Sequence, residues 1–287
     1  MVLESLLNPL KAEKKPWEMF FIGFLYSSIG IALSIWIFKE QSSLIMVFLT
    51  VMACVPIVYS TLKLEEGKDM AINKERILLR EHSKAIFFLM FLFAGITISC
   101  TLWYVFLPHD EFTIVFDKQI ATIEAVNSRV TGNTIQKFDD FTKIFLNNIK
   151  VLAFVMLFSF IYGAGAIFIL TWNATVIGAA MGNIVRGEIA SYASLLGFAK
   201  AGIYFQSIPL SFLSYAIHGI PEIAGYFFGG LAGGIISVAV IKHHYASKKF
   251  STILFDTSEL LIIAIIFLLI AAFFEVTVSP VIRQILF

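Results

Sequence analysis

Long apolar runs recur along this chain, and they constrain its fold more than any other feature. A run of about 20 apolar residues crosses the hydrocarbon core of a bilayer as one α-helix. The composition agrees, because 59% of the 287 residues are hydrophobic and only 14% are charged, whereas soluble domains carry about 25% charged residues. The sequence therefore predicts an all-α polytopic membrane protein, surrounded by the lipid bilayer, with six or seven transmembrane helices.

The boundaries of the apolar runs predict the individual spans. Residues 173–200 are only mildly apolar and contain Arg186 and Glu188, so we predict a half-embedded or re-entrant segment there, within a Gly/Pro-broken region between 173 and 222. If residues 201–217 cross the bilayer completely the chain has seven spans, and if they form a re-entrant half-helix it has six. The predicted spans are 17–38, 43–62, 85–107, 148–172, 201–217, 219–241 and 259–278.

The polar segments divide the chain into three parts. Residues 1–107 hold three spans and a charged loop, 63–84, in which the residue pattern predicts an amphipathic helix on the membrane surface. Residues 108–146 form an extracytoplasmic, acid-biased loop with one or two short helices, broken near Gly132. Residues 147–287 form a second membrane domain.

Basic residues predict the orientation. They gather in the head (1–16), in the 63–84 loop and in the patch KHHYASKK (242–249). The positive-inside rule then places the N-terminus in the cytoplasm of a multi-pass cell-membrane protein. Seven spans keep the 242–249 patch inside, whereas six force it outside, so we favour seven. The net charge of +1 gives no reason to expect a nucleic-acid partner.

Two of the predicted spans resemble each other. Residues 20–36 and 87–103 share Phe-Phe, Phe-Leu, two Ile and Trp in register, and the predicted topology points both from inside to outside. Parallel repeats of this kind occur in transporters. Chance similarity between two spans rich in Phe and Ile explains the pattern equally well.

Glycines recur every four residues in the second half of the chain. Gly225, Gly229 and Gly233 form one such row, and Gly178 and Gly182 repeat the spacing upstream. Small residues on one helix face let a second backbone approach closely in the membrane. These glycines therefore predict a helix-packing face, either within one subunit or between the subunits of a homo-oligomer.

His218 and Glu222 stand out in an apolar run. Being four residues apart, they share a face of a continuous helix. Pro221 lies between them and favours a helix start, which would put Glu222 in the first turn of a helix 221–241, beside its positive dipole end. The alternative is a buried polar cluster shared with other spans. The further members expected in such a cluster are Glu275, Asn147, Asn148, Asn173 and Gln206.

Catalytic motifs are missing from the sequence. One His and two Glu resemble the ligand set of a zinc or iron site, but no HExxH, nucleotide-binding loop or Ser-His-Asp pattern accompanies them. We therefore predict no catalytic residue, no metal and no cofactor. Cys54 and Cys100 both lie in apolar runs, which indicates buried, reduced thiols.

The order and spacing of these residues resemble the stage II sporulation protein M family. The likeness begins near residue 140 and continues to the end of the chain. It rests on Asn147-Asn148, Asn173 followed by Gly178 and Gly182, HGIPE at 218–222 before a Gly-rich helix, and Glu275 before Val-Thr-Val-Ser-Pro. The resemblance implies an integral membrane protein, and the family's namesake anchors peptidoglycan-degrading partners in spore formers.

Three functions are compatible with these observations. The first is a non-enzymatic scaffold that recruits other membrane or extracytoplasmic proteins through its outer or its cytoplasmic loop. The second is a transporter or channel that uses the His/Glu/Asn cluster, since broken helices with embedded carboxylates are typical of transport sites. The third, a metal-dependent intramembrane hydrolase, needs a bound metal.

Overall fold

The computed structural model describes almost the whole chain as α-helix. Seven helices are long and apolar enough to cross a membrane, so the predicted all-α polytopic architecture is confirmed. The N-terminal basic head up to residue 14, the predicted break near Gly132 and the 242–249 patch lie outside the described residues. The described ranges are 15–72, 75–127, 134–162, 165–191, 198–241 and 250–286.

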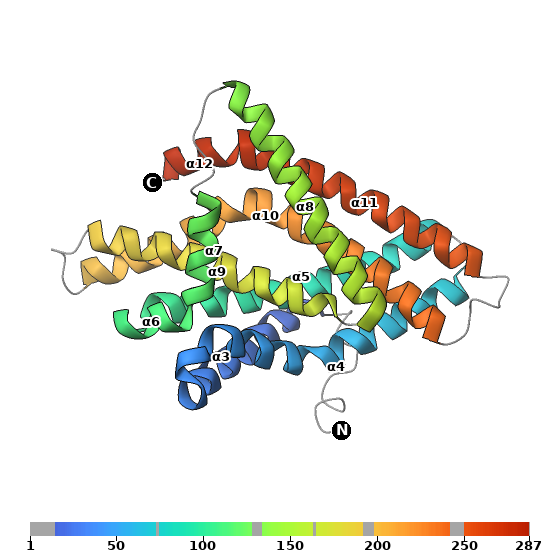
Figure 1. Cartoon of the computed structure of the whole chain (residues 1–287), viewed down its shortest axis with the longest axis horizontal. Coiled ribbons are helices and arrows are strands. Elements are labelled where there is room, and N and C mark those ends of the chain that lie inside the picture. Colours follow the sequence, from blue (N-terminus) through green and yellow to red (C-terminus); the bar gives the residue numbers. More distant parts are fainter. Residues whose placement is uncertain are drawn as a thin grey trace.

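The seven spans pack side by side in a bundle, and shorter helices gather at one end of it (Figure 1). The short helices α6 (His109–Val115) and α7 (Asp117–Asn127) follow α5, and α12 (Ser279–Leu286) follows α11. In Figure 1, α7 lies across α9 rather than along it. The spans are α3 (Glu18–Ile37), α4 (Ser42–Ala71), α5 (Glu75–Phe106), α8 (Thr134–Tyr162), α9 (Ala166–Ser191), α10 (Phe198–Ile241) and α11 (Phe250–Thr277).

Side-chain size decides which face of each helix points inward. On α3, Gly23 and Ser27 are buried, whereas Phe21 and Leu25 are exposed. Lipid solvates large apolar side chains as well as a protein core does, so small residues that allow close backbone contact occupy the helix interfaces instead.

Helices α3 and α5 show this packing most clearly. They run parallel, with Ser28 Oγ 2.9 Å from Ser99 Oγ. At the crossing point Gly23 faces the backbone of Leu92, and Gly95 faces the backbone of Phe20. The two segments that resemble each other in sequence are therefore neighbours, although nothing in the packing distinguishes a repeat from chance similarity.

The number of spans agrees with the seven-span prediction, but two predicted boundaries are wrong. The predicted span 148–172 is divided between α8, which ends at Tyr162, and α9, which begins at Ala166. The predicted re-entrant segment 173–200 is instead largely the continuous helix α9. The predicted start of the span 148–172 is too late, because α8 begins at Thr134 and its first turns are too polar to count as part of an apolar run.

Helix α10 replaces the two predicted helices 201–217 and 219–241. It continues without interruption for 44 residues and contains both Pro209 and Pro221. A proline in a helix interior costs about 3 kcal/mol. Ending the helix inside the bilayer leaves several backbone groups unpaired, at several kcal/mol each, so the helix continues. The prediction of a helix start at Pro221 is therefore wrong, and Glu222 lies deep inside a helix.

Helix α10 is too long to lie entirely within a bilayer. At 1.5 Å per residue its 44 residues extend about 66 Å, twice the roughly 30 Å hydrocarbon core. Figure 1 shows the N-terminal part of α10 running beside the C-terminal part of α9 at the left end of the molecule. This pair of helix ends therefore extends beyond the bilayer.

The charged loop 63–84 does not lie on the membrane surface as a separate helix. Its residues belong to the ends of α4 and α5, which continue almost to each other. Polar side chains join the two ends: His82 Nδ1 on α5 lies 2.7 Å from Glu65 Oε2 on α4. Lys68 Nζ donates to Glu65 Oε1 at 2.6 Å within α4 and lies 3.6 Å from Glu81 Oε2 on α5. A buried charged group requires a partner of this kind. The mixture of charged and apolar residues in 63–84, which resembled an amphipathic surface helix, therefore belongs to two helix ends that pack against each other.

Candidate functional site

Two glycines bring α9 against α5. A Cβ added to Gly178 would lie 2.6 Å from Cys100 Cβ, and one added to Gly182 would lie 2.6 Å from the Tyr104 ring. Real Cβ contacts are longer, so only glycine permits this approach. These contacts fix α9 against α5. The cavity described below lies between these two helices and α10, and α9 forms its floor.

The glycine row of α10 contacts other helices of the same chain. Gly225 faces Leu268 on α11, Gly229 faces Leu152 on α8, and Gly233 faces the backbone of α8 at Met156. Of the two interpretations left open by the sequence, the structure places these glycines at interfaces within the subunit.

A cavity of about 460 Å³ lies between α5, α9 and α10. Its apolar wall includes Phe87 and Phe91 from α5 and Phe212 and Ile220 from α10. These four side chains are also among the exposed large hydrophobic residues. The cavity therefore opens sideways, between α5 and α10, on a surface that faces lipid.

Three of the predicted polar residues line this cavity. They are Asn173 from α9 and His218 and Glu222 from α10. Because α10 is continuous, His218 and Glu222 are one turn apart on the same face. The helix-start explanation for Glu222 no longer applies, and the shared polar site is the arrangement that the structure contains.

Glu222 is half-buried, and it is the only charged residue among those that line the cavity. Tyr226, one turn further along α10, donates its hydroxyl to Glu222 Oε1 at 2.8 Å. Glu275 of α11 lies close enough to Glu222 for the two charges to repel each other. The carboxylate thus combines one hydrogen-bond donor with a negative neighbour, in apolar surroundings.

The remaining polar contacts fix the walls of the cavity. Ser279 at the start of α12 lies 2.9 Å, Oγ to Nδ1, from His218. Asn173 donates its side-chain amide to the Ile169 carbonyl at 2.9 Å. These contacts link α10 to α12 and hold the Asn173 side chain along its own helix.

Other predicted members of the cluster lie elsewhere. Asn147 and Gln206 are exposed. Asn148 is buried in the middle of α8, where its amide nitrogen has no hydrogen-bond partner within the described residues. Neither Asn148 nor Glu275 is among the residues that line the cavity.

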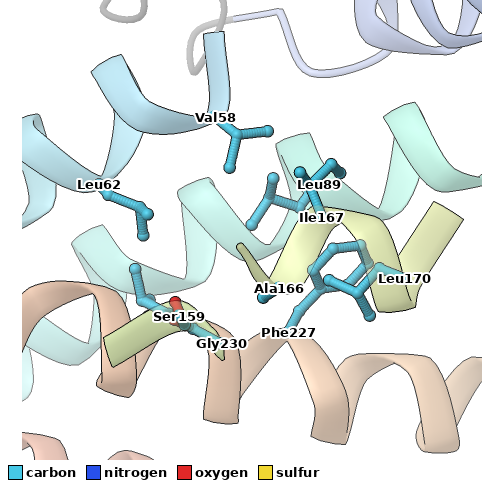
Figure 2. A pocket seen from close by; sticks show the side chains of 10 residues that line it. Val58, Leu62, Leu89, Ser159, Ala166, Ile167, Leu170, Phe227 and Gly230 are labelled. Carbon is cyan, nitrogen blue, oxygen red and sulfur yellow. The ribbon is translucent and has the colours of Figure 1, made fainter. Parts of the chain in front are cut away.

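A second, much smaller cavity lies in the centre of the bundle (Figure 2). Its volume is about 20 Å³, enough for about one water molecule. Figure 2 shows apolar side chains such as Val58, Leu89 and Phe227 converging on it. Ser159 donates its hydroxyl to the Gly230 carbonyl at 2.6 Å. The space is a packing gap rather than a ligand site.

Arg186, which the sequence suggested only as a sign of a half-embedded segment, lies at the C-terminal end of α5. Its Nε donates to the Tyr104 carbonyl at 2.8 Å, its Nη2 donates to the Leu107 carbonyl, and its guanidinium carbon lies 3.9 Å from the centre of the Phe112 ring. Carbonyls at a helix C-terminus lack partners within the helix, and a cation satisfies them. Arg186 thereby joins α9, the end of α5 and α6.

Gln119 is the second important residue that sequence reasoning missed. It is completely buried on α7. Ser43 on α4 donates to Gln119 Oε1 at 2.9 Å, and Gln119 Nε2 donates to Thr175 Oγ1 on α9 at 3.2 Å. The sequence offers one indication of this role: Gln119 lies three and four residues from Phe116 and Ile123, on the apolar face of a short helix. This network fastens α7 to two spans.

Replacing Gln119 with leucine is expected to loosen α7 from the bundle. The change removes the hydrogen bonds of the Gln119 side chain to Ser43 and Thr175, at a cost of about 2 kcal/mol. Amide hydrogen exchange in the α7 peptide should then accelerate about 30-fold. The control is Gln206→Leu, at an exposed glutamine, which should leave α7 unchanged. Equal exchange in both variants would show that the network does not hold α7.

The fold and the site define a helical, polytopic integral membrane protein with a polar cavity between three of its spans. The family model for Stage II sporulation protein M matches residues 84–280, and the chain belongs to that family. The match begins earlier than the expected residue 140, so it includes most of α5 and all the residues that line the cavity. No curated protein and no solved structure matches the chain.

Within the described ranges, no three His, Cys, Asp or Glu side chains are grouped closely enough to hold a metal ion.

Proposed function

We propose that this protein is a non-enzymatic membrane scaffold that binds partner proteins through an outer platform formed by α6 and α7. The observation that carries this proposal is the way these two short helices are held. Loops between spans are generally mobile, yet here Gln119 fastens α7 to α4 and α9, and Arg186 fastens the chain entering α6. A rigid surface binds with little loss of conformational entropy.

The orientation supports a position of this platform outside the cell. The charged segment 63–84 lies where α4 ends and α5 begins, at the opposite end of α5 from α6, and the positive-inside rule assigns a segment rich in Lys and Arg to the cytoplasm. We therefore propose a cell-membrane protein with a cytoplasmic N-terminus. The seven observed spans are compatible with this arrangement, since they put the two ends of the chain on opposite sides.

The chemistry of the platform indicates the kind of partner. Asp110, Asp117 and Glu124 are exposed on it, and the one described lysine of α7, Lys118, already pairs with Asp117 at 2.8 Å. The surface is thus acidic, and a basic face on an extracytoplasmic protein complements it. The family's namesake role in anchoring partners points in the same direction.

Charge reversal tests this function in the native host. We expect the double variant Asp117→Lys/Glu124→Lys to lose most of the cross-links to partner proteins that the wild type forms at α7. The matched control reverses two carboxylates at the other end of the spans, Glu18→Lys/Glu259→Lys, and should keep them. Loss of partners in both variants, or in neither, would contradict a platform-based scaffold.

The cavity favours a second function, a transporter. Embedded carboxylates are expensive in lipid and usually mark a substrate or ion pathway, and Glu222 with His218 and Asn173 forms such a set. If transport is the function, Glu222→Gln and His218→Ala abolish substrate movement in vesicles while partner capture at α7 stays normal. Unchanged flux in both variants would remove this alternative.

A further inference from the structure

We propose that the cavity between α5, α9 and α10 is a binding site for a single-chain lipophilic amine, with the ammonium group held by Glu222 and the alkyl chain lying between α5 and α10. This inference concerns a ligand and is independent of the scaffold proposal, which concerns α6 and α7. Shape, polarity and access each contribute to it.

The shape of the cavity fits one extended chain. It is lined along α5 from Phe87 to Thr97 and along α10 from Phe212 to Ile223, a length of about 15 Å at 1.5 Å per residue. Its volume of about 460 Å³ is open along one side, and an elongated, mostly apolar groove of this kind accommodates an extended alkyl chain.

The polarity of the cavity selects the head group. Glu222 is the one charged residue of the lining, and the Tyr226 hydroxyl is the one hydrogen-bond donor to it among the described residues. Asn173 donates one of its two amide hydrogens to Ile169, so its oxygen and its second N–H remain available to a ligand. The site thus combines the negative charge of Glu222 with side chains that accept and donate hydrogen bonds, His218 and Asn173 among them.

A head group that matches this site carries positive charge and N–H donors. A half-buried carboxylate in apolar surroundings favours a cationic partner, and an ammonium group supplies both the charge and the donors. The Glu222 carboxylate repels fatty acids and phosphate head groups, so the phosphate of an aminophospholipid disfavours its binding here.

Access comes from the bilayer. Phe87 and Ile220, on opposite sides of the opening, are 57% and 50% exposed, which places the entrance on the lipid-facing surface. A lipophilic amine partitions into the membrane with its chain among the acyl chains, so it reaches the opening without crossing water. The volume also falls within the range of about 300–1,000 Å³ that is typical of ligand sites.

Radiolabelled dodecylamine is the probe that tests this site on the purified, full-length protein in a neutral detergent. We expect saturable binding that Glu222→Gln weakens at least tenfold and that the control Glu259→Gln, at a carboxylate on α11 outside the cavity, leaves unchanged. Dodecanol, which has the same chain without the charge, should fail to compete. Competition by dodecanol equal to that by dodecylamine would overturn the assignment of the head group.

A second variant keeps the test independent of the carboxylate. Gly219 lines the cavity, and a Cβ added there meets no atom within 4 Å, so Gly219→Leu fills the space without disturbing the fold. We expect this variant to lose dodecylamine binding while keeping its melting temperature. Binding that survives both substitutions would overturn the proposal. Displacement of the probe by phosphatidylethanolamine in nanodiscs would overturn the single-chain assignment.

Discussion

Replacing Gly95 with valine is expected to separate α3 from α5 and to leave little folded protein. A side chain at this position would overlap the carbonyl oxygen of Phe20, a backbone atom of the neighbouring helix. Backbone cannot move aside as a side chain can, so the overlap forces the two helices apart. Overpacking costs about 1–3 kcal/mol, occasionally more, and we expect the upper end here because Gly23 makes the reciprocal contact with Leu92.

A milder pair of variants makes this prediction quantitative. Gly95→Ala should lower the free energy of unfolding, measured by denaturant titration in detergent micelles, by about 2 kcal/mol. Gly187→Ala is the control, because Gly187 is exposed on α9 and an added Cβ meets nothing within 4 Å. Alanine stabilises a helix relative to glycine by up to about 1 kcal/mol, so the control should be neutral or more stable. Equal stabilities of the two variants would refute the close contact.

Replacing Arg186 with alanine is expected to have the second-largest effect. The change removes two charge-assisted hydrogen bonds to the Tyr104 and Leu107 carbonyls and the contact with the Phe112 ring. Hydrogen bonds of this type contribute about 1.5–3 kcal/mol each, and a cation–π contact of a partly exposed arginine contributes about 1 kcal/mol. Allowing for relaxation, we expect a loss of roughly 3 kcal/mol in the free energy of unfolding, together with release of α6.

Two further variants separate charge from geometry at this position. Arg186→Lys keeps the charge but not the forked geometry that reaches two carbonyls, so it should recover less than half of the loss. Arg80→Ala removes an exposed arginine from α5 and should change the unfolding free energy by less than about 0.5 kcal/mol. If Arg186→Ala is as stable as Arg80→Ala, then Arg186 does not organise the end of α5.

The first three spans and the last one could be predicted from the sequence. Their apolar runs are long and uninterrupted, and the number of turns needed to cross a bilayer fixes their position within a few residues. The structure begins α3 at Glu18 and ends it at Ile37, against a predicted span of 17–38. The extensions of α4 and α5 beyond the predicted spans were missed, and so was the start of α11, which begins at Phe250 rather than at 259. Charged and polar residues within a long helix resemble a loop until their partners are known.

The middle of the chain could not be predicted in the same way, because its polar residues are satisfied by distant parts of the chain. Arg186 made residues 173–200 look half-embedded, yet its partners are carbonyls of α5, 79 and 82 positions away. The prolines of α10 resembled helix breaks, although a membrane helix tolerates them when the alternative is unpaired backbone. Sequence patterns record the presence of such groups but not the identity of their partners.

The site was partly predictable. His218, Glu222 and Asn173 were singled out as polar residues in apolar runs, and all three line one cavity. Asn147 and Gln206 were singled out for the same reason and are exposed. The difference arises from rotation about each helix axis, which packing determines and composition does not.

Access of a lipophilic amine to the cavity is the central claim of this account, and one fluorescence measurement tests it most directly. A single tryptophan is placed on the floor of the cavity by Ile177→Trp, in a protein whose four native tryptophans are phenylalanine, and the protein is reconstituted in a bilayer of unbrominated lipid that contains dodecylamine brominated on its alkyl chain. Reference proteins carry the tryptophan at Phe273, which is exposed on α11, or at Phe88, which is fully buried. The account predicts quenching at Ile177 close to that at Phe273, and quenching as weak as that at Phe88 would contradict it.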